Sequence, residues 1–233
     1  PALIVVHGGP SIPSNYLLPL VNVITDRSIV FFDQWGCGKS SRPTPISTSS
    51  DRKRSSMFPP FSIPTMVEHL RQLIEECWKL KHYHLLGHSW GGILSYEYLK
   101  LKEQHLHQLA PSLKKEKNPC HSLVLASTPS SARLVQDECQ ILMNQLTNIT
   151  DVDGGSNRKD EIEKLTVTDD DSGGNDTMSS LLQSDEFRQT HECRLPNTPL
   201  ALMDATAQAG PTPWRGIPAI LDYVAMPVVV VVV

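Results

Sequence analysis

Up to about residue 127, short runs of apolar residues alternate with stretches whose apolar positions recur at helical spacing. Four of the runs have the length of buried strands, namely Ala2–Val6, Ser28–Phe32, Tyr83–Leu86 and His121–Ala126. After the second run, five apolar residues fall on one helical face: Val67, Leu70, Leu73, Ile74 and Cys77. A second helix is predicted from Gly91 to about Lys102. This alternation predicts an α/β fold with a mostly parallel sheet and helices on both faces.

Polar segments separate these elements. The pattern Thr65-x-x-Glu68 is a capping box, which predicts that the first helix begins at Thr65. Residues 41–62 are rich in Ser, Pro and basic residues and predict a loop. Residues 103–119 are polar and basic, and they predict a long surface connection before the fourth strand.

From residue 128 the regular alternation stops. Helices are predicted at Arg133–Leu146, Ser180–His191 and Leu200–Gln208, whereas residues 148–179 are acidic and poor in aromatics and predict disorder. The valine run Val228–Val233 predicts a strand buried on both faces. About a hundred residues separate it from the fourth strand, which is too long for a crossover. We therefore expect a core at 1–127, an inserted helical cap or lid at 128–223 and a returning core strand at 224–233.

Composition narrows the class of protein. A chain of 233 residues with a net charge of -4 suits one α/β domain with an insertion and gives no case for nucleic acid. We find no signal peptide and no stretch long enough to span a membrane, so we expect no membrane partner. The five cysteines include no C-x-x-C pair, which favours reduced thiols, a cytoplasmic protein and no metal. The chain starts at Pro1 rather than Met, as is typical of a fragment or trimmed domain.

The pentapeptide Gly87-His88-Ser89-Trp90-Gly91 stands between the third predicted strand and the helix after it. A G-x-S-x-G in that context is the nucleophile-elbow pattern, in which small flanking residues allow a sharp turn that exposes the serine hydroxyl. Ser89 is therefore the candidate nucleophile. The alternative is an ordinary surface serine in a Gly-rich turn.

Acyl transfer by a serine also needs an imidazole base, an orienting carboxylate and an oxyanion hole. The backbone N–H of Trp90, the residue after the candidate nucleophile, is the first expected oxyanion donor. The second should come from the loop after an earlier strand, where His7-Gly8-Gly9-Pro10 stands. We expect Gly9 to be this donor, with Gly8 as the second choice. The alternative is a turn that merely ends the strand.

Other candidate chemistry is weaker. Gly36-Cys37-Gly38-Lys39-Ser40 invites a phosphate-loop interpretation, but that pattern needs a glycine where Asp33 stands. His88 is a poor candidate base, because neighbours at an elbow point in opposite directions. The remaining histidines in the core region have no carboxylate at a suggestive spacing: His82, His84, His105, His107 and His121. His191, in the insertion, is a weak candidate.

Three motifs in order, at residues 7–10, 33–40 and 87–92, resemble those of the proline iminopeptidase family. Its usual forms are H-G-G-P-G, D-Q-x-G-x-G-x-S and G-x-S-W-G. Residues 191–195 resemble a segment of that family's cap. The resemblance covers most of residues 1–127 and, more loosely, 180–233.

This resemblance implies an α/β-hydrolase fold with a helical cap. It implies a serine aminopeptidase that releases an N-terminal residue, typically proline, from a peptide substrate without metal or cofactor. By the same resemblance Ser89 is the nucleophile, and Gly9 and Trp90 supply the oxyanion donors. An esterase or lipase-like hydrolase and a catalytically inactive hydrolase-like domain remain the alternatives.

The chain departs from the family pattern at three points. Ser11 replaces the last glycine of the first motif. Pro213 stands where the family often has the cap glutamate that binds the substrate's amine, and Glu186 or Glu192 would have to substitute. Finally, no Asp or Glu follows Asp222 and no His follows His191, so the triad acid and base are not present in the sequence. We therefore expect these 233 residues alone to be nearly inactive.

Overall fold

The computed structural model describes residues 1–42, 62–108, 118–150, 187–193, 195–210 and 223–225. The strands are β1 (Ala2–Val6), β2 (Ile29–Phe31), β3 (Tyr83–His88) and β4 (Cys120–Ala126). The helices are η1 (Ser14–Asn22), α1 (Ile63–Arg71), η3 (Gln72–Cys77), α2 (Trp90–Gln108), α3 (Ala132–Thr150), η4 (Arg188–Glu192) and α7 (Leu200–Ala207). Of these, η1 is a 3₁₀ helix, and η3 and η4 are π-helices.

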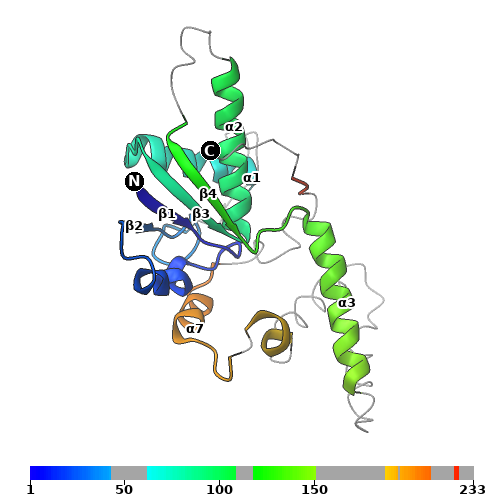
Figure 1. The fold of residues 1–233 in the computed structure, drawn as a ribbon. Coiled ribbons are helices and arrows are strands. Elements are labelled where there is room, and N and C mark those ends of the chain that lie inside the picture. The colour runs from blue at the N-terminus through cyan, green and yellow to red at the C-terminus, as the bar shows by residue number, and fades with distance from the viewer. Residues whose placement is uncertain (43–61, 109–117, 151–186, 194, 211–222, 226–233) are drawn as a thin grey trace, which may run out of the picture. The chain divides into compact units, whose positions relative to one another are not determined.

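The strands form one parallel sheet in the order β2-β1-β3-β4 (Figure 1). This confirms the four predicted strands and the α/β fold class. β1 pairs with β2 on one side, with Ile4 opposite Val30, and with β3 on the other, with Val6 opposite Gly87. Because all the strands are parallel, the loops after β1, β2 and β3 leave the sheet at the same edge. The three sequence motifs are therefore brought together by the strand order alone.

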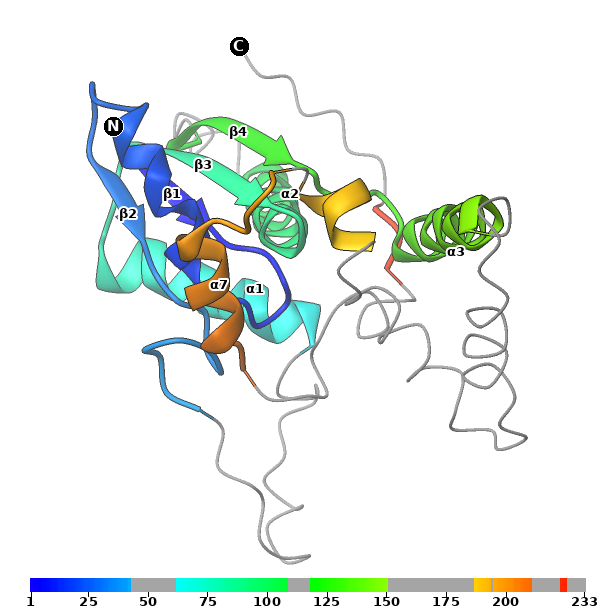
Figure 2. The same cartoon turned by 90° about the horizontal axis from the view of Figure 1, so that it is seen from below.

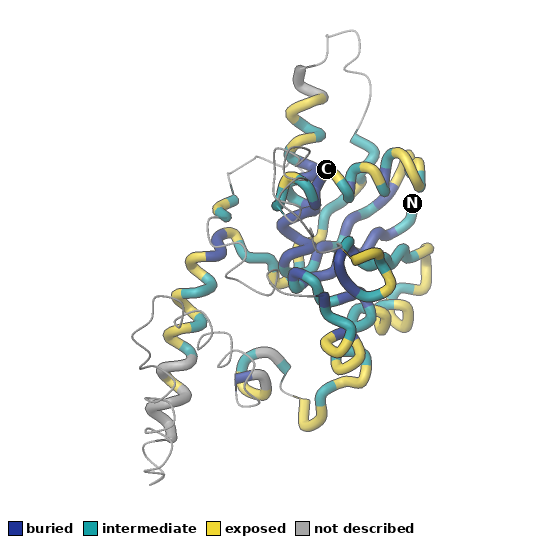
Figure 3. The backbone as a smooth tube through the Cα atoms, turned by 180° about the vertical axis from the view of Figure 1, so that it is seen from behind, coloured by how far each residue is buried: buried dark blue, intermediate teal, exposed yellow. Residues whose placement is uncertain are grey.

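The core is made by the two central strands and the helices packed on them. Ile4, Val5 and Val6 are fully buried, as a continuous apolar run on a central strand requires. Helix α2 packs against β3, β4 and β1, and α1 packs beside α2 (Figure 2). The burial pattern follows this arrangement, with β1, much of β3 and the start of α2 buried (Figure 3).

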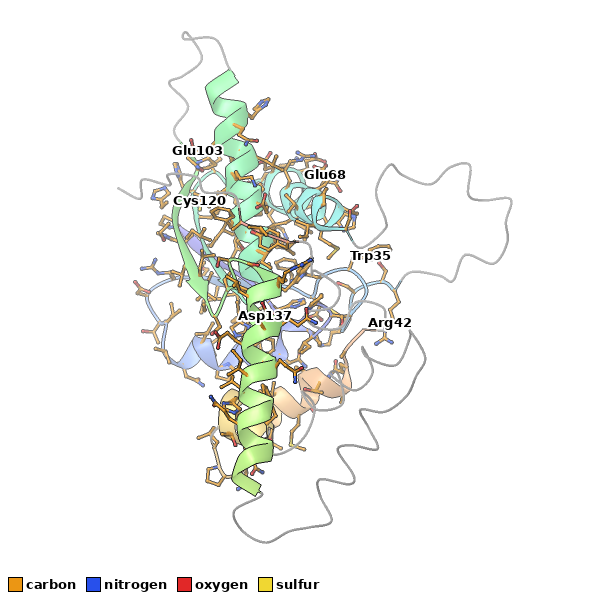
Figure 4. All side chains as sticks on the ribbon, turned by 90° about the vertical axis from the view of Figure 1, so that its right-hand side faces the viewer. Trp35, Arg42, Glu68, Glu103, Cys120 and Asp137 are labelled. Carbon is orange, nitrogen blue, oxygen red and sulfur yellow. The ribbon has the colours of Figure 1, made fainter. Side chains whose placement is uncertain are left out.

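The start of α1 differs from the capping-box prediction. The N-cap is Ser62, whose hydroxyl accepts a hydrogen bond from the Thr65 N–H at 3.4 Å, so the chain is already helical at Thr65. Pro64 lies in the first helical turn, where its missing N–H leaves no hydrogen bond unmade. Glu68 faces outward and binds Arg71 (Figure 4). The prediction of a helix was correct, but its start was three residues too late.

The expected apolar face of the first helix is interrupted. Leu70 and Ile74 are buried as predicted, but Cys77 is exposed. The helix widens after Arg71 into the π-helix η3, where the Trp78 N–H bonds to the Leu73 carbonyl five residues back. The wider turn shifts the register, and so Cys77 leaves the face that a 3.6-residue period assigns to it.

Helix α2 is longer than predicted. It continues to Gln108, so residues 103–108 are helical and not part of a surface connection. The side chain of Asn118 joins the C-terminal part of this helix to β4. Its Nδ2 donates to the Glu103 carboxylate, and its Oδ1 accepts from the Cys120 N–H. Glu103 and Cys120 are labelled in Figure 4.

The chain forms two compact units. One comprises residues 1–130, 200–215 and 225–233, and the other comprises residues 131–199 and 216–224. Helix α3 of the second unit confirms the helix predicted at 133–146, and α7 of the first confirms the one predicted at 200–208. Residues 148–150 belong to α3. The predicted loop at 43–61, the rest of the predicted disordered segment and the valine strand lie outside the described residues.

Candidate active site

Ser89 occupies the turn between β3 and α2. Its φ of 50° lies in the left-handed region that residues with a side chain rarely adopt. The turn is closed on both sides, since the Ser89 N–H donates to the Ala126 carbonyl at 2.8 Å and the Ser89 carbonyl accepts from the Gly92 N–H at 2.9 Å. No hydrogen bond joins the Ser89 hydroxyl to any described residue. The structure thus has the strand–turn–helix geometry that a nucleophile elbow requires.

The glycines around this turn are needed for close packing. A Cβ on Gly87 would lie 2.5 Å from the Cα of Gly92, and a Cβ on Gly91 would run into the Val6 carbonyl oxygen. The start of α2 therefore lies directly on the end of β1. Any larger residue at these two positions would push the helix away from the sheet.

The loop after β1 brings a second set of backbone N–H groups to the same edge of the sheet. The peptide bond between Gly9 and Pro10 is cis, and Gly9 has a φ of 119°. The Gly8 N–H donates to the Tyr16 hydroxyl at 2.7 Å. The Gly9 N–H makes no hydrogen bond with any described residue. Of the two candidate donors in this loop, Gly8 is therefore engaged, whereas the Gly9 N–H has no partner in the part of the chain that the structure describes.

Ser11, which departs from the motif, also has a left-handed φ of 71°. This is the region that favours glycine, so the substitution strains the backbone there. Its carbonyl accepts from the Gly210 N–H at 2.8 Å. The Gln208 carbonyl, also just after α7, accepts from the Gly38 N–H at 3.2 Å. The segment after α7 therefore ties the loops after β1 and β2 together.

Gln34 links three elements at the site. Its side-chain amide donates to the His7 carbonyl at 2.6 Å, and its side-chain oxygen accepts from Trp90 Nε1 at 2.9 Å. Its backbone N–H donates to His7 Nε2 at 2.8 Å. All three residues are buried. Burial lowers the pKa of His7 to about 4, so this imidazole is neutral and acts as a hydrogen-bond acceptor in the core.

The loop after β2 closes on Asp33. Its carboxylate accepts hydrogen bonds from the Ser14 N–H and hydroxyl and from the Lys39 N–H, at 2.8 to 3.0 Å. Burial opposes ionisation, but these hydrogen bonds outweigh it and lower the pKa of Asp33. Trp35, on the same loop, packs edge-on against His69 of α1 (Figure 4). A loop filled by its own carboxylate is unsuited to a phosphate, which agrees with rejecting the phosphate-loop interpretation.

His88 is a poor candidate for the catalytic base, because its side chain is engaged with Tyr16. Its Nδ1 lies 2.8 Å from the Tyr16 hydroxyl, and burial lowers the pKa of its imidazole. Among the described residues, no imidazole or carboxylate is hydrogen-bonded to Ser89, and no group of three His, Cys, Asp or Glu side chains could hold a metal ion. Nor does any helix within the described ranges have the length and apolar character needed to cross a membrane.

Tyr16 was not singled out from the sequence, and Gln34 was noted only as part of a motif. Tyr16 stands in a 3₁₀ helix with no local pattern around it, and its partner His88 is 72 positions away. A local signal for Gln34 was present, because it is the second polar residue after the apolar run that ends at Phe32. Its partner Trp90, however, is 56 positions away, and only the sheet order brings the two together.

Comparison with known proteins agrees with this geometry. Residues 1–152 match the family described as alpha/beta hydrolase fold. The chain therefore belongs to the α/β-hydrolase fold family.

Within that family, the chain is similar to proline iminopeptidases. The proline iminopeptidase of Heyndrickxia coagulans is 36% identical over 100 residues, which make up 43% of this chain and 30% of that protein. The one from Lactobacillus acidophilus is 34% identical over 146 residues, which make up 62% of this chain and 41% of that protein. The chain spans less than half the length of these curated relatives. They confirm the resemblance seen in the motifs.

Solved structures agree on the fold. The crystal structure of proline iminopeptidase from Mycobacterium smegmatis matches with a TM-score of 0.60 at 24% identity, over 96% of this chain and 67% of that one. The structure of VinJ matches with a TM-score of 0.60 at 19% identity, over 95% of this chain and 67% of that one. Identities this low are evidence for the fold alone.

Proposed function

We propose that this chain is the nucleophile-bearing part of a serine aminopeptidase of the proline iminopeptidase type. The observation that carries the proposal is Ser89, held at a left-handed φ on a strand–helix turn beside the Gly8–Gly9 loop. Its hydroxyl would attack the carbonyl carbon of the first peptide bond, and its proton would pass through the base to the departing amine. The C–N bond would break and the shortened peptide would leave, with the N-terminal residue held as an ester on Ser89. The acyl-enzyme would then be hydrolysed, releasing the N-terminal residue, typically proline. The similarity to curated proline iminopeptidases supports this substrate class.

The oxyanion formed in that attack would be stabilised by the backbone N–H groups of Gly9 and Trp90. Gly9 is favoured over Gly8 because the Gly8 N–H already donates to Tyr16. Trp90 follows the candidate nucleophile directly and begins α2, so its backbone lies at the N-terminal end of that helix, where the helix dipole favours negative charge. Donors of this kind contribute a factor of about 10² to 10³ to the rate.

We propose that the triad acid and base come from outside these 233 residues. His7 and His88 are engaged with Gln34 and Tyr16, respectively. The curated relatives also extend well beyond the matched region.

The odd number of cysteines without a C-x-x-C pair favours a cytoplasmic location.

Hydrolysis of proline p-nitroanilide and of p-nitrophenyl acetate tests the proposal. The product of the complete gene and the 233-residue chain are compared, each with a Ser89→Ala variant as control. We expect the complete product to cleave the anilide in a Ser89-dependent way and the 233-residue chain to be nearly inactive. Turnover of the ester alone would favour an esterase, which Pro213 at the expected cap glutamate position makes the second candidate. Robust Ser89-dependent anilide cleavage by the 233-residue chain would refute the external acid and base.

A fluorophosphonate probe separates an enzyme from an inactive hydrolase-like domain. The proposal predicts stoichiometric labelling of Ser89 in the complete gene product and none in its Ser89→Ala variant. Unlabelled Ser89 in a folded, complete protein would exclude a serine hydrolase.

A further inference from the structure

We propose that Tyr16 is a positioning residue that keeps the Gly8–Gly9 loop in register with the turn that carries Ser89. The inference rests on the proposed function, in which these two turns supply an oxyanion donor and the nucleophile. Tyr16 lies in η1, between β1 and β2, and touches neither Ser89 nor Gly9 through a hydrogen bond. Its role would be exerted through Gly8 and His88.

The hydroxyl of Tyr16 sits between a fixed donor and a fixed acceptor. It accepts the Gly8 N–H at 2.7 Å and lies 2.8 Å from His88 Nδ1. A phenol has one proton to donate, and its oxygen is already an acceptor here. We therefore infer that the Tyr16 hydroxyl donates a hydrogen bond to Nδ1 of a neutral His88. Burial favours that neutral form by lowering the pKa of the imidazole.

The packing around this hydrogen-bonded chain leaves little freedom. The rings of Tyr16 and His88 meet edge to face with centroids 5.3 Å apart. A Cβ on Gly8 would lie 2.8 Å from His88 Nδ1 and 3.0 Å from the Tyr16 oxygen. A glycine at position 8 is thus required for Tyr16 and His88 to lie this close to the loop. In that position the Tyr16 hydroxyl engages the Gly8 N–H, so that Gly9 is left as the donor toward a substrate.

His88 immediately precedes Ser89. The two hydrogen bonds of Tyr16, to Gly8 and to His88, therefore connect the loop after β1 with the turn that carries Ser89. Loss of the hydroxyl would leave the Gly8 N–H and the His88 Nδ1 unpaired and would free the loop to shift. A misplacement of about 1 Å in a catalytic constellation can reduce the rate by about a hundredfold. The proposal therefore predicts an effect on kcat rather than on substrate binding.

Tyr16→Phe removes only the hydroxyl, and Tyr98→Phe is its matched control. Tyr98 is also buried, and its hydroxyl bonds to Tyr83 and Glu75, away from the turns. Amide hydrogen exchange at Gly8, measured by NMR on the 233-residue chain, should be about tenfold faster in Tyr16→Phe, the factor expected for one net hydrogen bond. Tyr98→Phe should leave the exchange unchanged. Equal exchange rates at Gly8 in the two variants would overturn the proposal.

Rescue at His88 separates positioning from packing. His88→Asn places an acceptor oxygen at the Nδ1 position and should keep the slow exchange at Gly8, whereas His88→Leu should lose it. In the complete gene product, Tyr16→Phe and His88→Leu should lower kcat at least tenfold with KM within about twofold, and His88→Asn should retain most activity. Unchanged kcat in Tyr16→Phe would refute the positioning role. An inactive wild-type protein would instead refute the proposed function, while Gly8 exchange would still decide whether Tyr16 couples the turns.

Discussion

Replacing Gln34 by Met tests whether the buried hydrogen bonds at the site stabilise the fold. Met has nearly the length of Gln, so the change removes two polar groups while leaving almost no cavity. It removes the hydrogen bonds that Gln34 makes with the Trp90 indole N–H at 2.9 Å and with the His7 carbonyl at 2.6 Å. Each buried group that loses such a hydrogen bond costs about 1 to 3 kcal/mol. We expect Gln34→Met to lower the free energy of unfolding by about 3 kcal/mol.

A double-mutant cycle with Trp90→Phe isolates one of these terms. Phe has no indole N–H, so in the Gln34→Met background it removes the donor whose bond to Gln34 the first substitution broke. We expect the double variant to be more stable than the sum of the single changes predicts, by about 1 to 2 kcal/mol. Urea denaturation followed by far-UV circular dichroism measures all four proteins, with the midpoint shifting at constant slope.

Two results would refute this reasoning. A loss below about 1 kcal/mol in Gln34→Met would mean that water or a neighbouring group satisfies both partners. Single effects that add within about 0.5 kcal/mol would mean that the bond between Gln34 and Trp90 carries no net stability.

Three further predictions concern stability. Gly91→Ala should cost about 3 kcal/mol in urea denaturation, because the new Cβ meets the Val6 carbonyl oxygen; near-wild-type stability would contradict the close packing. Ser62→Ala should cost about 1 kcal/mol by the same assay and Thr65→Ala less, since Ser62 is the N-cap. A larger loss in Thr65→Ala than in Ser62→Ala would instead indicate that the capping box beginning at Thr65 starts the helix. The pKa of His7 is lowered to about 4, below the unfolded value of about 6.5, so protonation favours the unfolded chain. Stability should fall by roughly 3 kcal/mol from pH 7 to pH 4, and His7→Asn should flatten that slope.

The strands could be predicted because each contains a run of apolar residues that can be seen in the local sequence. Ala2–Val6 is apolar at every position, and the structure buries it between two neighbouring strands. The turn that carries Ser89 was predictable for a related reason, since a strand, a Gly-x-Ser-x-Gly and a helix are consecutive in sequence. Such patterns depend on neighbouring residues alone.

The errors arose where local patterns competed. Thr65 and Glu68 form a plausible capping box, but Ser62 followed by Pro64 makes a better start, and only one N-cap can begin the helix. The π-helix after Arg71 has no counterpart in a 3.6-residue template, and so Cys77 was placed on the wrong face. The links made by Tyr16 depend on strand order, which periodicity does not contain.

The polar residues of the three motifs mostly position the site. Asp33 holds the loop after β2, and Gln34 joins the ends of β1 and β2 to the first residue of α2. His7 is buried and neutral, an acceptor within the core rather than a base. Ser89 alone among them has a hydroxyl with no hydrogen bond to the described residues. A motif match of this kind therefore identifies the scaffold around a candidate nucleophile, and under the proposed function substrate preference would be decided by residues elsewhere. Pro213, at the expected position of an amine-binding glutamate, is where that preference should be tested first.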